Sequence, residues 1–217
     1  MSKKFICTIP LQPPREGQAQ RGLDKTKYLI HESCGFAFDG ETRFPIIPVI
    51  YSNANPDDEI EVILIMFDYH ETQLNRYYFQ EELDEAQAAI GFTVKGGAPV
   101  EITTSGAEDN ETQIKLFRNL TACLSDGDTL FMCVTFGQKP LTIIQFMTLN
   151  YAYKIRKNIE IGAVVYGRWN NSLVSKDPSV IYDVTSLFLL NDVISNLSNI
   201  KAPNAEELID RILSDEK

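Results

Sequence analysis

Histidine and cysteine are scarce in this chain, and neither occurs in a metal-binding pattern. The 217 residues include two histidines, His31 and His70, and four cysteines, none of which forms a CxxC pair. So few histidines argue against a histidine-based zinc site. Single cysteines inside apolar runs, such as Cys7 and Cys133, are typical of small buried thiols in a reducing compartment. The sequence therefore predicts no metal and no disulfide framework.

Long hydrophobic runs are also missing. The opening MSKKFICTIPLQPP has two lysines but only a short apolar stretch before Pro10. A secretory signal needs a longer apolar core than this. No run approaches the length of a membrane span. We therefore expect a soluble, cytoplasmic protein that makes no membrane contact.

Several nucleotide and hydrolase signatures are absent as well. The chain contains no GxxxxGK[ST], which argues against a P-loop nucleotidase, and no GxGxxG after its first apolar run, which argues against a nicotinamide or flavin enzyme. It has no GxSxG, the nucleophile turn of α/β-hydrolases. We expect no cofactor of these classes.

The charge balance is acidic. Thirty Asp and Glu residues against twenty Lys and Arg residues give a net charge of -10. Binding to long nucleic acids depends on neutralising phosphates with many cations, so this balance argues against it. A small anionic ligand remains possible, because backbone N–H groups and one or two cations hold phosphate in a local pocket.

Apolar runs alternate with segments of helical periodicity, in a chain of ordinary globular composition. Near-continuous apolar runs are typical of strands buried on both faces of a parallel sheet. The expected strands are Phe5–Pro10, Glu61–Phe67, Thr129–Thr135, Ile159–Tyr166 and Val180–Val184, with helices over 71–90, 109–125, 141–157 and 186–197. This alternation predicts a Rossmann-like α/β fold, a doubly wound and mostly parallel sheet with helices on both faces.

Two segments do not fit the simple alternation. Tyr28–Ser33 and Phe44–Tyr51 look extended, but Pro45 and Pro48 are unsuited to a central strand. We therefore expect them to form a β-hairpin or arm inserted in the fold. Residues 1–200 are predicted to form one domain, and residues 201–217 a short acidic helix that caps the domain or contacts a partner.

Ligands of open α/β sheets bind outside the carboxyl ends of the strands, where the strand order switches. In TFGQKP, Gly137 lets the backbone approach a ligand closely, and Pro140 suits the first position of a helix. The N–H groups of the new helix favour phosphate, and Lys139 adds a positive charge. The alternative is an ordinary strand-to-helix turn with a solvated lysine.

Other strand ends offer weaker signals. Asp68 and His70 follow a predicted strand and present polar groups to a base or ribose, although Asp68 is equally suited to cap a helix. Trp169 is the only tryptophan, and it either stacks on an adenine or packs in the protein.

The stretch from Asp128 to Gly167 resembles one branch of the CRISPR-associated Rossmann-fold (CARF) proteins. It has a strand that ends in a Thr-x-Gly-x-basic turn, then a long apolar helix, then a strand that ends Tyr-Gly. The later YDVTSLFLL and the opening CTIPLQP also match that branch in layout. This sequence departs from the usual pattern in having Lys139 where arginine is common and Phe136 where histidine is often found.

The resemblance implies a homodimer in which strand-end loops of two copies form one pocket for a cyclic oligoadenylate, such as cyclic tetra- or hexa-adenylate. Lys139 would contact a phosphate, and Lys139 and Thr135 are the candidate catalytic residues. The candidate ligand-binding residues are Thr8, Ile9, Pro10, Leu11, Gln12, Asp68, His70, Phe136, Gly137, Gln138, Arg168 and Trp169.

Two functions follow from that resemblance. One is a metal-independent ring nuclease of type III CRISPR antiviral defence, in which a ribose 2′-OH attacks its neighbouring phosphate and leaves a 2′,3′-cyclic phosphate end. The alternative is a non-catalytic sensor that regulates a separate effector protein. Because the sequence has no RxxxxH nuclease motif, we expect no output domain of that kind.

Overall fold

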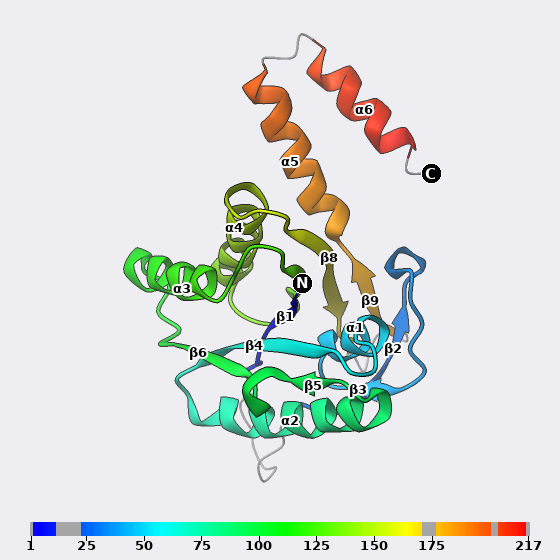
Figure 1. Cartoon of the computed structure of the whole chain (residues 1–217), viewed down its shortest axis with the longest axis vertical. Helices are drawn as coiled ribbons and strands as arrows, with labels where there is room; N and C mark the ends of the chain where they lie inside the picture. Colours follow the sequence, from blue (N-terminus) through cyan, green and yellow to red (C-terminus); the bar gives the residue numbers. More distant parts are fainter. Residues whose placement is uncertain (1, 12–22, 171–176, 201–203, 216–217) are drawn as a thin grey trace.

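One mixed sheet lies between two layers of helices (Figure 1). This computed structural model of the chain describes residues 2–11, 23–170, 177–200 and 204–215. Within these residues nine strands form the sheet, most of them parallel. The Rossmann-like α/β prediction is confirmed.

Five of the strands closely follow the predicted apolar runs. Their bounds are β1 Lys3–Thr8, β2 Thr26–Ile30, β3 Glu41–Thr42, β4 Glu59–Phe67, β5 Thr93–Val94, β6 Val100–Thr104, β7 Thr129–Cys133, β8 Glu160–Arg168 and β9 Ser179–Asp183. The helices are α1 Ile46–Asn53, α2 His70–Ile90, α3 Asn110–Ala122, α4 Lys139–Ile155, α5 Thr185–Asn199 and α6 Ala205–Asp215, with short 3₁₀ turns at Glu32–Cys34 and Lys95–Gly97.

The parallel part of the sheet is doubly wound about β1. The chain moves outward from β1 to β4 and then β6, and returns to add β7 and β8 on the other side of β1. Helices α1 and α2 therefore cover one face, and α3, α4 and the start of α5 cover the other. The strand order switches between β1 and β7, which is where such sheets bind ligands.

Alternation along the buried strands creates two cores. Phe5 and Cys7 of β1 face the α1/α2 layer, and Ile6 between them faces the α3/α4 layer. This is the pattern that a strand buried on both faces dictates. Phe5 stacks on Phe131 of β7, with ring centroids 4.6 Å apart.

The prediction of an extended segment at Phe44–Tyr51 is wrong, because residues 46–53 form α1. Pro45 occupies the cap position of this helix and Pro48 lies in its first turn. Proline is tolerated there, since the first-turn N–H groups have no partner within the helix. The two prolines mark a helix start rather than an edge strand.

The predicted hairpin is instead formed by β2 and β3, which pair antiparallel at Thr26 and Lys27. At the same end of the sheet, β9 runs antiparallel to β8 and parallel to β2. Helix α5 leaves the end of β9 and projects from the body, and α6 packs beside it (Figure 1). In the described part of the chain, no helix combines the length and apolarity that a membrane crossing requires.

Candidate functional site

Four strand ends meet at one edge of the sheet. Strands β1, β4, β7 and β8 are parallel neighbours, so their carboxyl ends share that edge. The turn after β1 leads toward the α1/α2 layer, and the turn after β7 leads into α4 on the opposite layer. The edge between β1 and β7, here called the switch edge, therefore has a helix layer on each side.

The TFGQK turn joins β7 to α4 at the switch edge. Gly137 has φ 111°, a conformation that L residues rarely adopt, and a Cβ added there would lie 2.4 Å from Leu141 Cδ2. Helix α4 begins at exposed Lys139, so Pro140 occupies its second position rather than the predicted first. Gln138 precedes the helix and makes no side-chain cap bond. Pro140 has no N–H, and the Leu141 N–H donates to the Gln138 carbonyl at 3.0 Å, so this first turn offers a ligand fewer N–H groups than an ordinary uncapped helix.

Thr135 ties the turn to the neighbouring strand. Its Oγ1 accepts a hydrogen bond from the Gly167 N–H at 2.8 Å and lies 3.0 Å from Cys133 Sγ. A Cβ at Gly167 would clash with Pro45 at 2.3 Å, so only glycine fits between α1 and this contact. The hydroxyl of Thr135 is therefore engaged in holding β7 and β8 in register.

The end of β1 contributes a buried hydroxyl. Thr8 is 1% exposed, and its Oγ1 has no hydrogen-bond partner within the described residues. By strand alternation Thr8 faces the same layer as Ile6, which is the layer that contains α4. Ile9 and Pro10 are buried and Leu11 is exposed, while Gln12 lies outside the described residues.

Asn75 of α2 holds the turn after β1 in place. This fully buried side chain donates to the Pro10 carbonyl at 2.8 Å and accepts from the Leu23 N–H at 3.0 Å. Sequence reasoning missed Asn75. The sequence did hold one sign of this role, because Asn75 is an amide among the apolar core positions of a predicted helix.

Gln145 of α4 is a second buried amide that sequence reasoning missed. Its Nε2 donates to the carbonyl of Cys133, the last residue of β7, at 3.2 Å. Its Oε1 has no partner among the described residues, although the side chain is fully buried. Two unpaired polar atoms, on Thr8 and Gln145, thus come from the elements that border the switch edge. Burial of a polar group without a hydrogen bond costs stability, so such pairs deserve a functional explanation.

The loop after β4 is exposed. Asp68 and His70 both lie on the surface, and Asp68 donates its backbone N–H to the Thr104 carbonyl at 2.9 Å. Tyr69, not Asp68, occupies the cap position of α2, so the helix-cap alternative for Asp68 is wrong. The side chains of Asp68 and His70 are accessible to a ligand at this edge.

Two aromatic residues near the switch edge, Phe136 and Trp169, pack inward. Trp169 packs against the core beneath α1, and its Nε1 donates to Thr26 Oγ1 at 3.2 Å. Phe136 packs against the same core. Arg168 is exposed, and its Nη2 donates to the Pro178 carbonyl at 3.5 Å. In this structure Trp169 has the packing role that the sequence left open beside adenine stacking.

The cysteines of the switch edge are not nucleophiles. Burial raises the pKa of Cys133 to about 11 and raises the pKa of Cys7 well above its ordinary value. Both thiols are therefore neutral at physiological pH, and a neutral thiol reacts poorly. No group of three or more His, Cys, Asp or Glu side chains within the described ranges is arranged to hold a metal ion.

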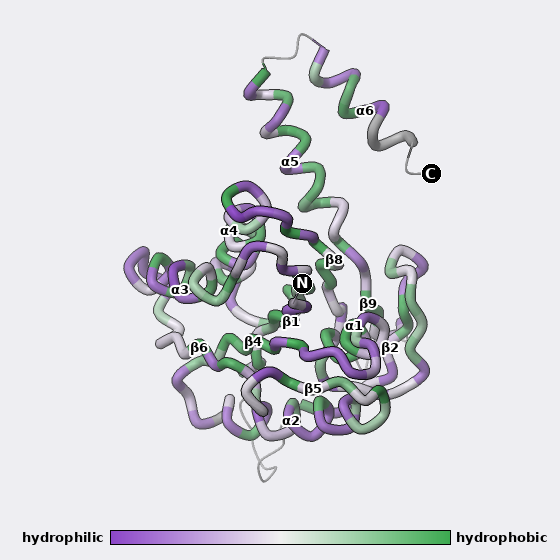
Figure 2. The backbone as a smooth tube through the Cα atoms, in the orientation of Figure 1, coloured by the Kyte–Doolittle hydropathy of each residue, from purple (hydrophilic) through white to green (hydrophobic). Residues whose placement is uncertain are grey.

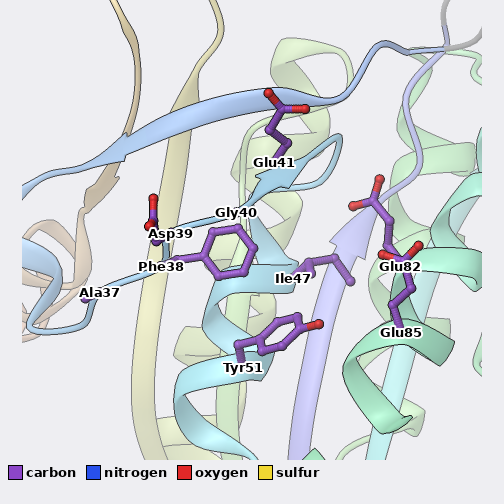
Figure 3. A pocket seen from close by; sticks show the side chains of 9 residues that line it. All are labelled: Ala37, Phe38, Asp39, Gly40, Glu41, Ile47, Tyr51, Glu82 and Glu85. Carbon is purple, nitrogen blue, oxygen red and sulfur yellow. The ribbon is translucent and has the colours of Figure 1, made fainter. Parts of the chain in front are cut away.

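Cavities elsewhere in the molecule have a different chemistry. One of about 540 Å³ lies between the loop at residues 37–41, α1 and α2 (Figure 3). Its lining includes the carboxylates of Asp39, Glu41, Glu82 and Glu85, which repel phosphate. A smaller cavity of about 110 Å³ at the end of β6 is lined largely by hydroxyls and by Lys115.

Comparison with protein-family models and with curated proteins finds no relative of this chain. None of the protein-family models matches the chain, and no curated protein matches it either.

Proposed function

We propose that this protein binds a cyclic oligoadenylate at the switch edge, in a pocket shared by two copies of the chain, and that it cleaves the ring. The observation that carries the proposal is the start of α4. An uncapped helix amino terminus follows a glycine with φ 111° and presents exposed Lys139 at the point where the strand order switches.

This arrangement suits a phosphate. First-turn N–H groups and the helix dipole attract anions, and a flexible lysine adds a full positive charge. The buried, unpaired hydroxyl of Thr8 supplies a further polar group on the α4 side of β1. The acidic chain as a whole disfavours long polyanions, so a small ligand fits better. The oligoadenylate itself comes from the CARF resemblance of Asp128–Gly167.

Cleavage would need no metal. The 2′-OH of one ribose attacks the adjacent phosphorus, the bond from phosphorus to the 5′ oxygen breaks, and the products are a 2′,3′-cyclic phosphate end and a 5′-OH end. Lys139 would stabilise the negative charge that develops on the phosphoryl oxygens. The pocket would contribute by holding the 2′-OH in line with the leaving oxygen.

One observation favours the non-catalytic alternative. The hydroxyl of Thr135 accepts the Gly167 N–H and lies 3.0 Å from Cys133 Sγ, so this residue is engaged in holding the two strands. Lys139 alone stabilises charge but supplies no general base. On this alternative the same pocket senses the ring and passes the signal to a separate effector protein.

The test measures binding and cleavage separately. Purified protein is mixed with cyclic tri-, tetra- and hexa-adenylate in EDTA, with melting temperature reporting binding. Opening of the ring by its own 2′-OH leaves the mass unchanged, so linear products are identified by liquid chromatography against standards, and by the added mass of one water after acid hydrolysis of the cyclic phosphate. Binding raises the melting temperature by mass action. Linear products with 2′,3′-cyclic phosphate ends support the nuclease, and a rise in melting temperature with intact rings supports the sensor.

Two matched variants locate the site. Lys139→Met removes the charge but keeps the apolar stem, and loss of a charged hydrogen bond of about 1.5–3 kcal/mol weakens binding about 10- to 100-fold. Lys157→Met is the control, because Lys157 is exposed beyond the carboxyl end of α4, away from the switch edge, and it should bind like the parent protein. No change of melting temperature with any ring would refute the proposed function, and equal binding by both variants would refute the site.

A further inference from the structure

A small polar cavity lies between the end of β6 and α3, and we call it the β6–α3 cavity. Its volume is about 110 Å³, and its lining consists of four residues with hydroxyl groups, one amide, one lysine and one leucine. Unlike the larger cavity beside α1, it has no carboxylate among its lining residues. In Figure 2, hydrophilic and hydrophobic residues alternate along α3, so this helix carries polar side chains next to its buried apolar ones. The lining therefore suits a polar or anionic ligand.

The sheet side of the cavity is formed by Thr104, the last residue of β6. Thr104 is 9% exposed and lies on the same face of the strand as Ile102, which packs in the α3/α4 layer. Its backbone is held in place, because its carbonyl accepts the Asp68 N–H at 2.9 Å. Its hydroxyl forms no hydrogen bond with any described residue. Thr104 thus presents an unpaired polar atom to the cavity, and such atoms in buried residues call for a partner.

Helix α3 forms the other side of the cavity with Lys115 and Asn119. These residues are four apart, so they are neighbours on one side of the helix. Six of the nine lysines in the described ranges form an ion pair with a carboxylate, but Lys115 does not. The side-chain amide of Asn119 has no hydrogen-bond partner among the described residues either. A lysine without a carboxylate, beside amide and hydroxyl donors, is suited to hold an anion.

The acidic residues at the start of α3 leave Lys115 available. The two carboxylate oxygens of Asp109 accept the Thr112 N–H at 2.9 Å and the Thr112 hydroxyl at 3.0 Å, which caps the helix. These hydrogen bonds hold the pKa of Asp109 below its ordinary value. Glu111 is exposed one turn before Lys115 and forms no ion pair with it in the structure. The charge of Lys115 is therefore free to act on a ligand.

The volume restricts the size of that ligand. A water molecule occupies about 30 Å³ of the liquid, so about 110 Å³ holds three or four waters, or one tetrahedral oxyanion of five heavy atoms. Pockets for larger organic ligands measure about 300–1,000 Å³. A whole nucleotide therefore does not fit.

We propose that the β6–α3 cavity binds a tetrahedral oxyanion, either free phosphate or the terminal phosphoryl group of a small phosphomonoester. Lys115 supplies the charge, and Thr104 and Asn119 donate hydrogen bonds. The cavity is distinct from the switch edge, because β4 and β1 separate β6 from β7, three strand spacings or about 14 Å. The inference does not depend on the proposed function.

The test is the melting temperature of the full chain, titrated with inorganic phosphate and separately with ribose 5-phosphate, at an ionic strength held constant with sodium chloride. Binding to the folded chain raises the melting temperature by mass action, and a ligand at ten times its Kd should give a rise of about 3–6 °C for a chain of this length. A response to inorganic phosphate alone identifies the free ion as the ligand, and a response to ribose 5-phosphate identifies a terminal phosphoryl group.

Three variants assign the binding to the cavity. Lys115→Met removes the charge, and Thr104→Val removes the hydroxyl with little change of shape, so each should weaken binding at least about 10-fold. Arg118→Met is the matched control, because it removes a positive charge from an exposed position of the same helix that does not line the cavity. This control should bind like the parent protein. Circular dichroism confirms that each variant is folded, and exposed Lys115 decides the result if Thr104→Val does not fold.

The inference is overturned if neither compound raises the melting temperature, or if Lys115→Met and Arg118→Met bind equally well. A rise that is lost in Lys139→Met but kept in Lys115→Met would overturn it as well, because the anion would then lie at the start of α4.

Discussion

Gly137 offers the sharpest test of the geometry at the switch edge. Its φ of 111° lies beyond the left-handed region that L residues tolerate, so any side chain there strains the backbone by about 1–3 kcal/mol. A Cβ would also lie 2.4 Å from Leu141 Cδ2, and overpacking of this kind costs about 1–3 kcal/mol. Gly137→Ala should therefore lower the free energy of unfolding by about 2–6 kcal/mol.

Gly96 provides a control that separates the two costs. Its φ is 73°, within the left-handed region, and a Cβ there meets no atom within 4 Å. Gly96→Ala should cost only the backbone strain, about 1–2 kcal/mol. Urea denaturation measures both variants under the same conditions. For a chain of this length each kcal/mol corresponds to roughly 2–4 °C in melting temperature, so the two variants should differ visibly.

A double variant tests whether Leu141 is the obstacle. Leu141→Ala removes the clashing methyl groups, so the two substitutions together should cost less than the sum of each alone. If Gly137→Ala costs no more than Gly96→Ala, or if the double variant shows simple additivity, the close approach of this turn to α4 is wrong. The turn at Gly137 would then give no geometric support to phosphate binding at the start of α4.

Three further outcomes are expected. Asn75→Ala leaves the buried Leu23 N–H and the buried Pro10 carbonyl unpaired, so it should lower the free energy of unfolding by about 2–4 kcal/mol, measured by urea denaturation. An unchanged urea midpoint would show that the two hydrogen bonds of Asn75 do not hold the turn after β1. Thr135→Val should cost about 1–2 kcal/mol while Thr135→Ser costs less, because only serine keeps the acceptor for the Gly167 N–H. Iodoacetamide at pH 8 should label the half-buried Cys123 before the buried Cys7, because burial raises the pKa of Cys7 further. Mass spectrometry of native and urea-unfolded protein measures the order of labelling. The reverse order would mean that the strand assignment of Cys7 is wrong.

The sequence predicted the sheet well because buried parallel strands leave a strong signal. Glu61–Phe67 and Thr129–Thr135 are continuous apolar runs, and they became β4 and β7 with small shifts at their ends. The helix expected over residues 71–90 became α2, which ends at Ile90 and is capped by Gly91 with φ 95°. These features depend on local composition, which the sequence records directly.

The prediction for residues 44–51 was wrong because its two prolines fit two different structures, an edge strand and the start of a helix. FPIIPVIY has the apolar and β-branched content of a strand, but both prolines fall where a short helix begins. Burial of Ile46, Ile47 and Ile50 against the sheet then determines the outcome, and that burial depends on tertiary packing. Local sequence alone does not contain it.

The candidate site was predicted in part. Strand-end loops were expected at one edge, and parallel pairing brings the turns after β1, β4 and β7 there. The clamp by Asn75 and the buried amide of Gln145 were missed, because each acts on a strand end far away in sequence. Contacts of this range become visible only when the layers are assembled.

The antiparallel direction of β9 carries the chain away from the switch edge before α5 begins. Helix α4 starts at the switch edge and extends about 25 Å, at 1.5 Å per residue, before its last turns reach α5. Asn150 and Lys154 contact Asn191 and Asp192 there, on the arm of α5 and α6 that projects from the body. One continuous helix therefore connects the turn at Lys139 to the base of the arm.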